Sequence, residues 1–220
     1  MKRTIVIILM LFTGIPLMAQ EDSRVITTGV PFLLISSDAR ASGMGDIGVA
    51  TMPDAFSQQW NPAKYVFSTK KMGVGISYTP YLAELVNDIA LLNAGFYNRI
   101  DERSAYAFSL RYFGLGEIEL RQNPDDPGEI VKPNELALDG SYALKLSERF
   151  SMAVAGRYIR SDLRIQGVDP NARAGNSFAV DIAGYYQSGK QFYNDFDGRW
   201  RAGFSVSNLG PKIKYDEGGQ

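Results

Sequence analysis

Apolar residues alternate with small or polar residues along most of the chain, and this period of two constrains the fold more than any other feature. In residues 71–80 (KMGVGISYTP), Val74, Ile76 and Tyr78 fall on one face, while glycine, serine and threonine fall on the other. Such alternation is typical of a β-strand whose two faces meet different surroundings. Similar patterns predict seven strands, at residues 71–80, 88–99, 103–121, 134–146, 149–165, 176–188 and 198–209.

The second face of these strands indicates the class of β-protein. In a soluble β-sandwich the apolar face is buried and the other face is charged and wet. Here the second face mixes small residues with charged ones, and aromatic residues lie near the ends of the apolar face. This combination is typical of an outer-membrane β-barrel, with apolar side chains toward lipid and polar ones inside. A soluble secreted sandwich or an adhesin repeat is the alternative. The inward-facing charges would be Arg111, Asp139, Lys145, Arg157, Asp181 and Arg201.

The connections between the predicted strands alternate in length. Residues 100–102 and 147–149 are short turns, whereas residues 122–133 and 166–176 are long, polar and rich in Pro, Gly and Asp. Bacterial barrels have short turns on one side of the membrane and long loops on the other. Residues 115–121 are expected to continue the preceding strand, with a bend at the nearby glycines.

The first nineteen residues have the features of a secretory signal peptide. Lys2 and Arg3 precede a short apolar run at residues 4–12, and the segment ends at Ala19, which predicts cleavage before Gln20. An uncleaved anchor is the alternative, but the run is well short of the roughly 20 residues that a spanning helix needs. The sequence therefore predicts export.

Composition excludes many chemistries. The chain has no Cys and no His, which removes disulfides, thiolate metal sites, imidazole ligands and the Ser-His-Asp triad. Its 23 Lys and Arg are balanced by 24 Asp and Glu, so there is no basic excess that would predict nucleic-acid binding.

Residues 20–68 do not alternate and are expected to form a compact plug inside or under the barrel. Gly43, Gly45 and Gly48 match the spacing GxGxxG, but no βαβ unit precedes them, so dinucleotide binding is not predicted. A short helix is expected from Pro53 or Asp54 through residue 59, ended by the Asn-Pro pair at 61–62.

No catalytic, cofactor-binding or metal-binding residue is predicted. Serines beside aspartates in residues 36–46 are more simply explained as turns and caps than as nucleophiles. Paired aspartates in the loops lack the further ligands and glycine spacing of a calcium loop. The residues considered are Ser36, Ser37, Ser42, Asp38, Asp46, Asp125, Asp126, Asp195 and Asp197.

Seven is an odd number of strands, and single-chain bacterial barrels have even numbers. The sequence also ends on a loop-like tail at residues 214–220. Truncation, with further strands on the C-terminal side, is therefore expected. A closed eight-strand barrel would require one more strand before Met72.

Two segments carry a resemblance to a known family. Residues 38–67 (DARASGMGDIGVATMPDAFSQQWNPAKYVF), together with residues 207–215 (SNLGPKIKY), resemble the PorV family, outer-membrane components of the Bacteroidetes type IX secretion system. That family belongs to the wider FadL-like family of fourteen-strand barrels. Residues 60–63 (WNPA) are similar to the NPA motif that follows the hatch in the wider family. The resemblance covers nearly all of the mature chain.

The resemblance implies an all-β, transmembrane antiparallel β-barrel of FadL-like type, with the seven strands forming half of fourteen. The expected organisation is a signal peptide at 1–19, a hatch or plug at 20–68 and barrel strands at 69–220. The implied function is a shuttle or docking barrel in the outer membrane. It would receive cargo with a C-terminal secretion domain from the translocon barrel and pass it to a sortase-type attachment complex, using loops such as 122–133 and 166–176.

Two alternatives follow from the same resemblance. A FadL-like channel for long-chain fatty acids or other hydrophobic compounds would need an apolar lumen, and the inward charges argue against one. PorV-like proteins have also been linked to removal of acyl chains from lipopolysaccharide, but without His only Asp, Glu or Lys could activate a serine. The expected protein is not an enzyme, has no cofactor, and has outer-membrane lipid and secretion components as partners.

Overall fold

A computed structural model describes residues 30–121, 127–163, 173–192 and 196–215. Its main element is a seven-strand antiparallel sheet. The spatial order of these seven strands is the same as their order along the chain. The strands, in spatial order, are β1 (Met72–Pro80), β2 (Ile89–Arg99), β3 (Ser104–Leu115), β6 (Asn134–Lys145), β7 (Phe150–Asp162), β8 (Gly175–Gln187) and β11 (Arg201–Leu209). The seven predicted strands are confirmed, each within a few residues of its bounds except the extension of the third.

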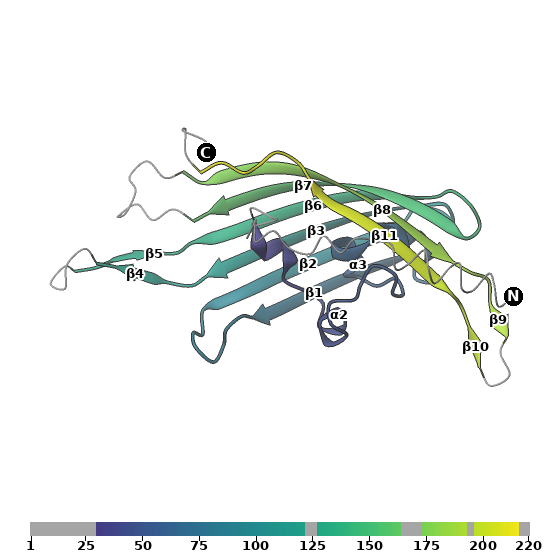
Figure 1. Cartoon of the computed structure of the whole chain (residues 1–220), viewed down its shortest axis with the longest axis horizontal. Helices are drawn as coiled ribbons and strands as arrows, with labels where there is room; N and C mark the ends of the chain where they lie inside the picture. Colours follow the sequence, from purple (N-terminus) through teal and green to yellow (C-terminus); the bar gives the residue numbers. More distant parts are fainter. Residues whose placement is uncertain (1–29, 122–126, 164–172, 193–195, 216–220) are drawn as a thin grey trace, which may run out of the picture.

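Two small hairpins lie outside this sheet. Residues beyond Leu115 do not continue β3. They form β4 (Ile118–Leu120), which pairs with β5 (Glu129–Val131). Gly116, with a φ of 81°, lies between β3 and β4, so the predicted bend becomes a break between two sheets. At the opposite end of the molecule, β9 (Gln191–Phe192) pairs with β10 (Asp197–Gly198) within the connection from β8 to β11 (Figure 1).

Residues 30–68 pack against one face of the sheet, which curls around them (Figure 1). This N-terminal segment contains η1 (Pro31–Leu34), α2 (Ala39–Gly43), α3 (Ser57–Trp60) and η2 (Pro62–Phe67). The predicted helix begins at Ser57 rather than at residue 53 or 54. Asp54 nevertheless lies at its start, where Oδ1 accepts hydrogen bonds from the Phe56 amide and the Ser57 hydroxyl, both at 3.0 Å.

The two faces of the sheet differ as the alternation predicts. We call the face that packs against residues 30–68 the covered face and the opposite one the exposed face. Ile76 and Phe108 lie on the exposed face, with 77% and 56% of their surface accessible, whereas Arg111 and Asp139 on the covered face are only 1% and 4% accessible. Most large apolar side chains of the sheet therefore point away from the protein interior, and the buried charged ones point into it. Exceptions on the covered face are Leu91, Tyr97, Phe113, Ile159 and Tyr185, which are buried.

The sheet is not closed. β1 and β11 are its edge strands and do not pair with each other. Among the described residues, no helix has the length and apolar character needed to cross a membrane. The predicted signal peptide at 1–19 lies outside the described residues, as do most of the loop at 166–176 and part of the loop at 122–133.

Candidate functional site on the covered face

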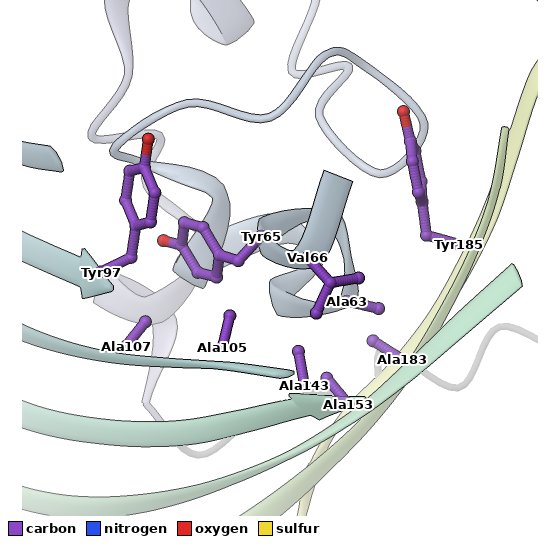
Figure 2. Packing of buried hydrophobic residues seen from close by; sticks show 10 residues of the cluster. All are labelled: Ala63, Tyr65, Val66, Tyr97, Ala105, Ala107, Ala143, Ala153, Ala183 and Tyr185. Atoms are coloured by element: carbon purple, nitrogen blue, oxygen red, sulfur yellow. The ribbon is translucent and has the colours of Figure 1, made fainter. Parts of the chain in front are cut away.

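The helical turn η2 lies directly on the covered face because the sheet presents small side chains there. Ala105, Ala107, Ala143, Ala153 and Ala183 are all buried and come from four different strands (Figure 2). Their methyl groups let the backbone of η2 approach the sheet closely. The sequence predicted that the small side chains of the strands would face the inside of a barrel. In the structure they form the surface on which residues 62–67 pack.

Two aromatic pairs fix η2 from either side. Tyr65 stacks on Tyr97 of β2 with ring centroids 4.6 Å apart (Figure 2). The rings of Phe67 and Tyr185 of β8 have centroids 5.5 Å apart. The Tyr97 hydroxyl lies 2.9 Å from the Ser68 hydroxyl, just beyond η2. Gly73 leaves room for the Tyr97 ring, since a Cβ there would lie 2.5 Å from it. These contacts hold the N-terminal segment to strands that are far apart in the sheet.

Asn61 is the central residue of the WNPA segment. It is fully buried, and its side-chain amide donates to the carbonyls of Val49 at 3.0 Å and Gly184 at 2.9 Å. Its Oδ1 accepts from the Ala63 amide at 3.0 Å, which caps η2, and Pro62 occupies the first position of that turn. The segment predicted to end a helix therefore also begins the next turn and joins it to β8.

Lys64 is buried beside Asn61 without a carboxylate partner at salt-bridge distance in the described part of the chain. Its Nζ donates to the Gly48 carbonyl at 2.7 Å and to the Thr51 hydroxyl at 3.1 Å. Burial lowers the pKa of Lys64 to about 8, although the charge of Asp54 opposes this effect. Lys64 thus ties the loop before α3 to η2 with a single charged group.

The glycines of the GxGxxG spacing serve the backbone of the N-terminal segment. Gly43 ends α2, and Gly45 adopts a φ of 76° just beyond it, a conformation that suits glycine. Gly48 lies against the indole of Trp60, and a Cβ at Gly48 would overlap that ring. The pattern therefore reflects a helix end and a close aromatic contact.

A chain of ion pairs crosses the covered face beside η1. Arg157 of β7 pairs with Asp139 of β6 and, at 2.9 Å, with Asp181 of β8. Arg111 of β3 lies 3.7 Å from Asp139, and its guanidinium donates to the Leu33 carbonyl at 3.1 Å. Two cations therefore alternate with two anions, and the last link attaches the N-terminal segment to the sheet.

Asn208 completes this network from β11. Its side chain accepts from Arg157, and its amide N–H donates to Asp181 at 2.7 Å. Asn208 has a φ of 62°, at an irregularity where the pairing of β11 with β8 shifts. Beyond it the Ser177 hydroxyl donates to the Pro211 carbonyl at 3.0 Å, and Tyr215 donates to Ser161 at 2.9 Å. Residues 207–215 thus pack along β7 and β8.

The structure places the predicted inward charges on the covered face, though in two environments. Arg111, Asp139, Arg157 and Asp181 are buried and paired, whereas Lys145 and Arg201 are half-buried. Asn61 was noted in the sequence only as part of a helix-ending Asn-Pro pair and of the WNPA motif, without a bonding role. Lys64 and Asn208 were not singled out, and their only signal was their position inside the two segments that carry the family resemblance.

Two of the three serines considered as nucleophiles have hydrogen-bond partners for their hydroxyls, and the third, Ser42, lies exposed in α2. The Ser37 hydroxyl donates to Gln59 at 2.7 Å, and the Ser36 hydroxyl donates to the Asp38 carbonyl at 3.2 Å. Asp38 caps α2 by accepting from the Arg40 amide. Asp46 adopts a φ of 60° in the turn after α2.

The loop aspartates can be followed only in part. Asp125, Asp126 and Asp195 lie outside the described residues, and Asp197 pairs with Lys190 at 3.8 Å. Within the described ranges, no group of three or more acidic side chains could hold a metal ion.

The two segments that carry the family resemblance both pack on the covered face. They are residues 38–67 and 207–215. The sequence profile of one protein family, described as "Type IX secretion system protein PorV", matches residues 18–220. The chain belongs to the PorV family. No curated protein matches the sequence. PorV membership implies a role in type IX secretion, an outer-membrane location in that system, partners within it, and a protein that is not an enzyme.

Proposed function

We propose that this PorV-family chain is an outer-membrane shuttle or docking barrel of the type IX secretion system. It receives cargo with a C-terminal secretion domain from the translocon barrel and passes it to the cell-surface attachment complex. In this proposal residues 1–19 are a signal peptide, residues 20–68 are a plug, and residues 69–220 supply barrel strands of FadL-like type.

The inverted chemistry of the sheet is the observation that carries this proposal. Apolar side chains of all seven strands lie on the exposed face, and ion pairs lie on the covered face. A contiguous apolar surface of this size calls for a covering, and in an exported outer-membrane protein that covering is lipid. Unpaired backbone at the two edges is costly in lipid, which supports closure by further strands.

The filled covered face favours the shuttle over a fatty-acid channel. The ion-pair network and η2 occupy the side that would become the lumen. An apolar groove of about 590 Å³ lies instead on the exposed face, around Gly140 and Phe108. A channel for hydrophobic compounds needs an apolar path through the lumen, and these residues do not offer one.

Short turns of bacterial barrels face the periplasm, which places the long connections outside the cell. The hairpin β4–β5 belongs to that outer side and presents Ile130, which is 60% exposed. Apolar side chains on a projecting hairpin suit contact with another protein. We assign cargo contact to this hairpin.

The test is affinity purification of the tagged full-length protein from solubilised outer membranes, with identification of the chains that co-purify. A large translocon barrel and secreted cargo are expected. Ile130→Glu should lower cargo recovery, whereas Leu146→Glu in the opposite turn should leave it unchanged. Recovery of bound fatty acid with neither partner would contradict the shuttle and favour the channel.

A further inference from the structure

A cavity of about 400 Å³ opens at the end of the sheet that carries the short turns. Its floor includes Phe67, the last residue of η2, and its walls come from the β6–β7 turn and the β8–β11 connection. Lys145, Arg149 and Arg199 line it, and Glu148 is the single acidic residue among the described residues of its lining. The cavity lies on the inner side of the sheet, because Lys145 belongs to the covered face.

Backbone and serine hydrogen bonds hold the walls of this cavity in place. The Gln187 amide donates to the Arg149 carbonyl at 2.8 Å, which joins the β6–β7 turn to β8. The Ser188 hydroxyl donates to the Gly189 carbonyl and accepts from the Trp200 amide, both at 2.8 Å. The two ends of the β8–β11 connection are therefore tied together, so Arg199 is positioned beside the turn that carries Arg149.

The three cations are available to a ligand. Within the described part of the chain, none of them forms an ion pair; Lys145 lies over the Phe67 ring, 5.4 Å from its centroid. Arg149 lies above Gly189, where a Cβ would be 3.8 Å from its guanidinium. By contrast, the exposed Lys190 of the same connection has Asp197 within 3.8 Å. Unpaired cations around one cavity favour an anionic occupant.

The net charge of the connections at this end of the sheet also favours an anionic ligand. At this end, the described segments 68–71, 99–103, 145–149, 188–192 and 196–201 contain nine Lys and Arg against four Asp and Glu. At the other end, the described residues 81–88, 116–121, 127–133, 163 and 173–174 contain three Lys and Arg against five Asp and Glu. A surface with such a field attracts anions to one end and repels them from the other.

We propose that this cavity binds an acidic peptide segment of a partner protein. Its volume exceeds what a single small anion fills, and the cations are spread over two connections rather than converging on one point. Its place on the inner side of the sheet separates it from lipid headgroups around the exposed face. Arginine clusters recognise acidic peptide motifs in this way. The location of the partner in the periplasm rests on the proposed orientation, whereas binding to purified protein does not.

The experiment uses the full-length protein extracted in a neutral detergent and a fluorescent hexaglutamate peptide with blocked ends, followed by anisotropy. Binding is expected, and raising the salt from 50 to 200 mM should weaken it several-fold. Arg149→Glu and Arg199→Glu should each reduce affinity at least tenfold. Arg103→Glu, an identical charge change in the neighbouring turn outside the cavity, should change it less than twofold. Arg199→Gln provides a milder variant if charge reversal disturbs folding.

Three results would overturn the proposal. The first is no binding of hexaglutamate by the folded protein. The second is an equal loss in Arg103→Glu, which would indicate a general basic surface rather than this cavity. The third is displacement of the peptide by an equal concentration of inorganic phosphate, which would indicate a simple anion site.

Discussion

The covered and exposed faces of the sheet are built from the same strands but meet opposite environments. On the covered face, Arg157 holds Asp139 and Asp181 at the centre of a buried network. On the exposed face, Ile182 of β8 lies one residue from Asp181 and points the other way, 38% accessible. Two neighbouring residues of one strand are therefore a buried charged side chain and an exposed apolar one.

This difference teaches that burial in the protein and apolar character are separate properties. In a soluble protein the buried face is the apolar one, because water is the alternative surroundings. Here the N-terminal segment brings its own polar groups to the covered face, such as the Leu33 carbonyl that Arg111 binds. Asp139, Arg157 and Asp181 can be buried because they pair with one another, and in the proposed barrel the apolar face would meet lipid.

The largest effect is expected from removing the centre of the network. Arg157→Ala would leave Asp139 and Asp181 buried without their cation, and breaking a buried pair in this way typically costs about 3–5 kcal/mol. The measurement is urea unfolding in detergent, followed by circular dichroism. Arg160→Ala, which removes an exposed cation on the same strand, is the control and should cost less than about 1 kcal/mol. Equal effects of the two variants would show that the network is not structural.

The next largest effect tests the exposed face. Ile182→Arg places a charge midway along β8, where contact with the centre of a bilayer would cost about 2–4 kcal/mol. Leu146→Arg places the same charge in the β6–β7 turn, where the cost should be about 0–1 kcal/mol. The amount of each variant that reaches the outer membrane, relative to unaltered protein, reports the difference. Similar amounts for both would mean that Ile182 does not face lipid.

A smaller effect is expected at the contact between the two regions. Asn61→Ala would leave the Gly184 and Val49 carbonyls and the Ala63 amide without their partner, at a cost of about 1–3 kcal/mol. Asn61→Asp keeps the acceptor for Ala63 but loses both donors, so it separates the cap from the attachment to β8. Unfolding in detergent would measure both, and an unchanged Asn61→Ala protein would contradict the role assigned to this residue.

The smallest effect concerns pH. Because the pKa of Lys64 is lowered to about 8 in the folded protein from 10.5, the unfolded chain binds more protons between these values. Folding stability should therefore rise with pH above about 8, by up to about 2 kcal/mol at pH 9.5. Measurements should stop there, because burial raises the pKa of Tyr65 well above its usual 10.0 and reverses the trend at higher pH. Lys64→Met should abolish the rise, and its persistence would exclude Lys64 as the cause.

Much of the fold was predictable because alternation is a local property. The strands around Tyr78 and Phe108 were located from five or six residues each, and the period of two showed which side chains share a face. In β2 the pattern did not decide which face is covered, since Leu91 and Tyr97 are buried on the covered face. The error at residues 115–121 arose because the alternation continues through the break at Gly116. Nothing local distinguishes one bent strand from two strands in separate sheets.

The candidate site was less predictable, because its residues meet only after strands align. Asp139 and Arg157 lie opposite each other across a short turn, so their pairing could be inferred from the register of one hairpin. The contacts of Asn61 with Gly184, and of Asn208 with Arg157, span long stretches of chain. Such contacts depend on how the N-terminal segment and the last strand fold back onto the sheet.

By itself, the sequence determined where the strands lie, which side chains share a face and which family the two motif segments resemble. These follow from the pleat of a β-strand and from residue identity, and neither depends on distant parts of the chain. Only the tertiary structure decided which charges pair, that η2 packs on alanine side chains, and that Lys145, Arg149 and Arg199, which form no ion pair with another described residue, surround one cavity. Distances between side chains on different strands depend on register, twist and the path of the N-terminal segment, and these are set by the packed molecule as a whole.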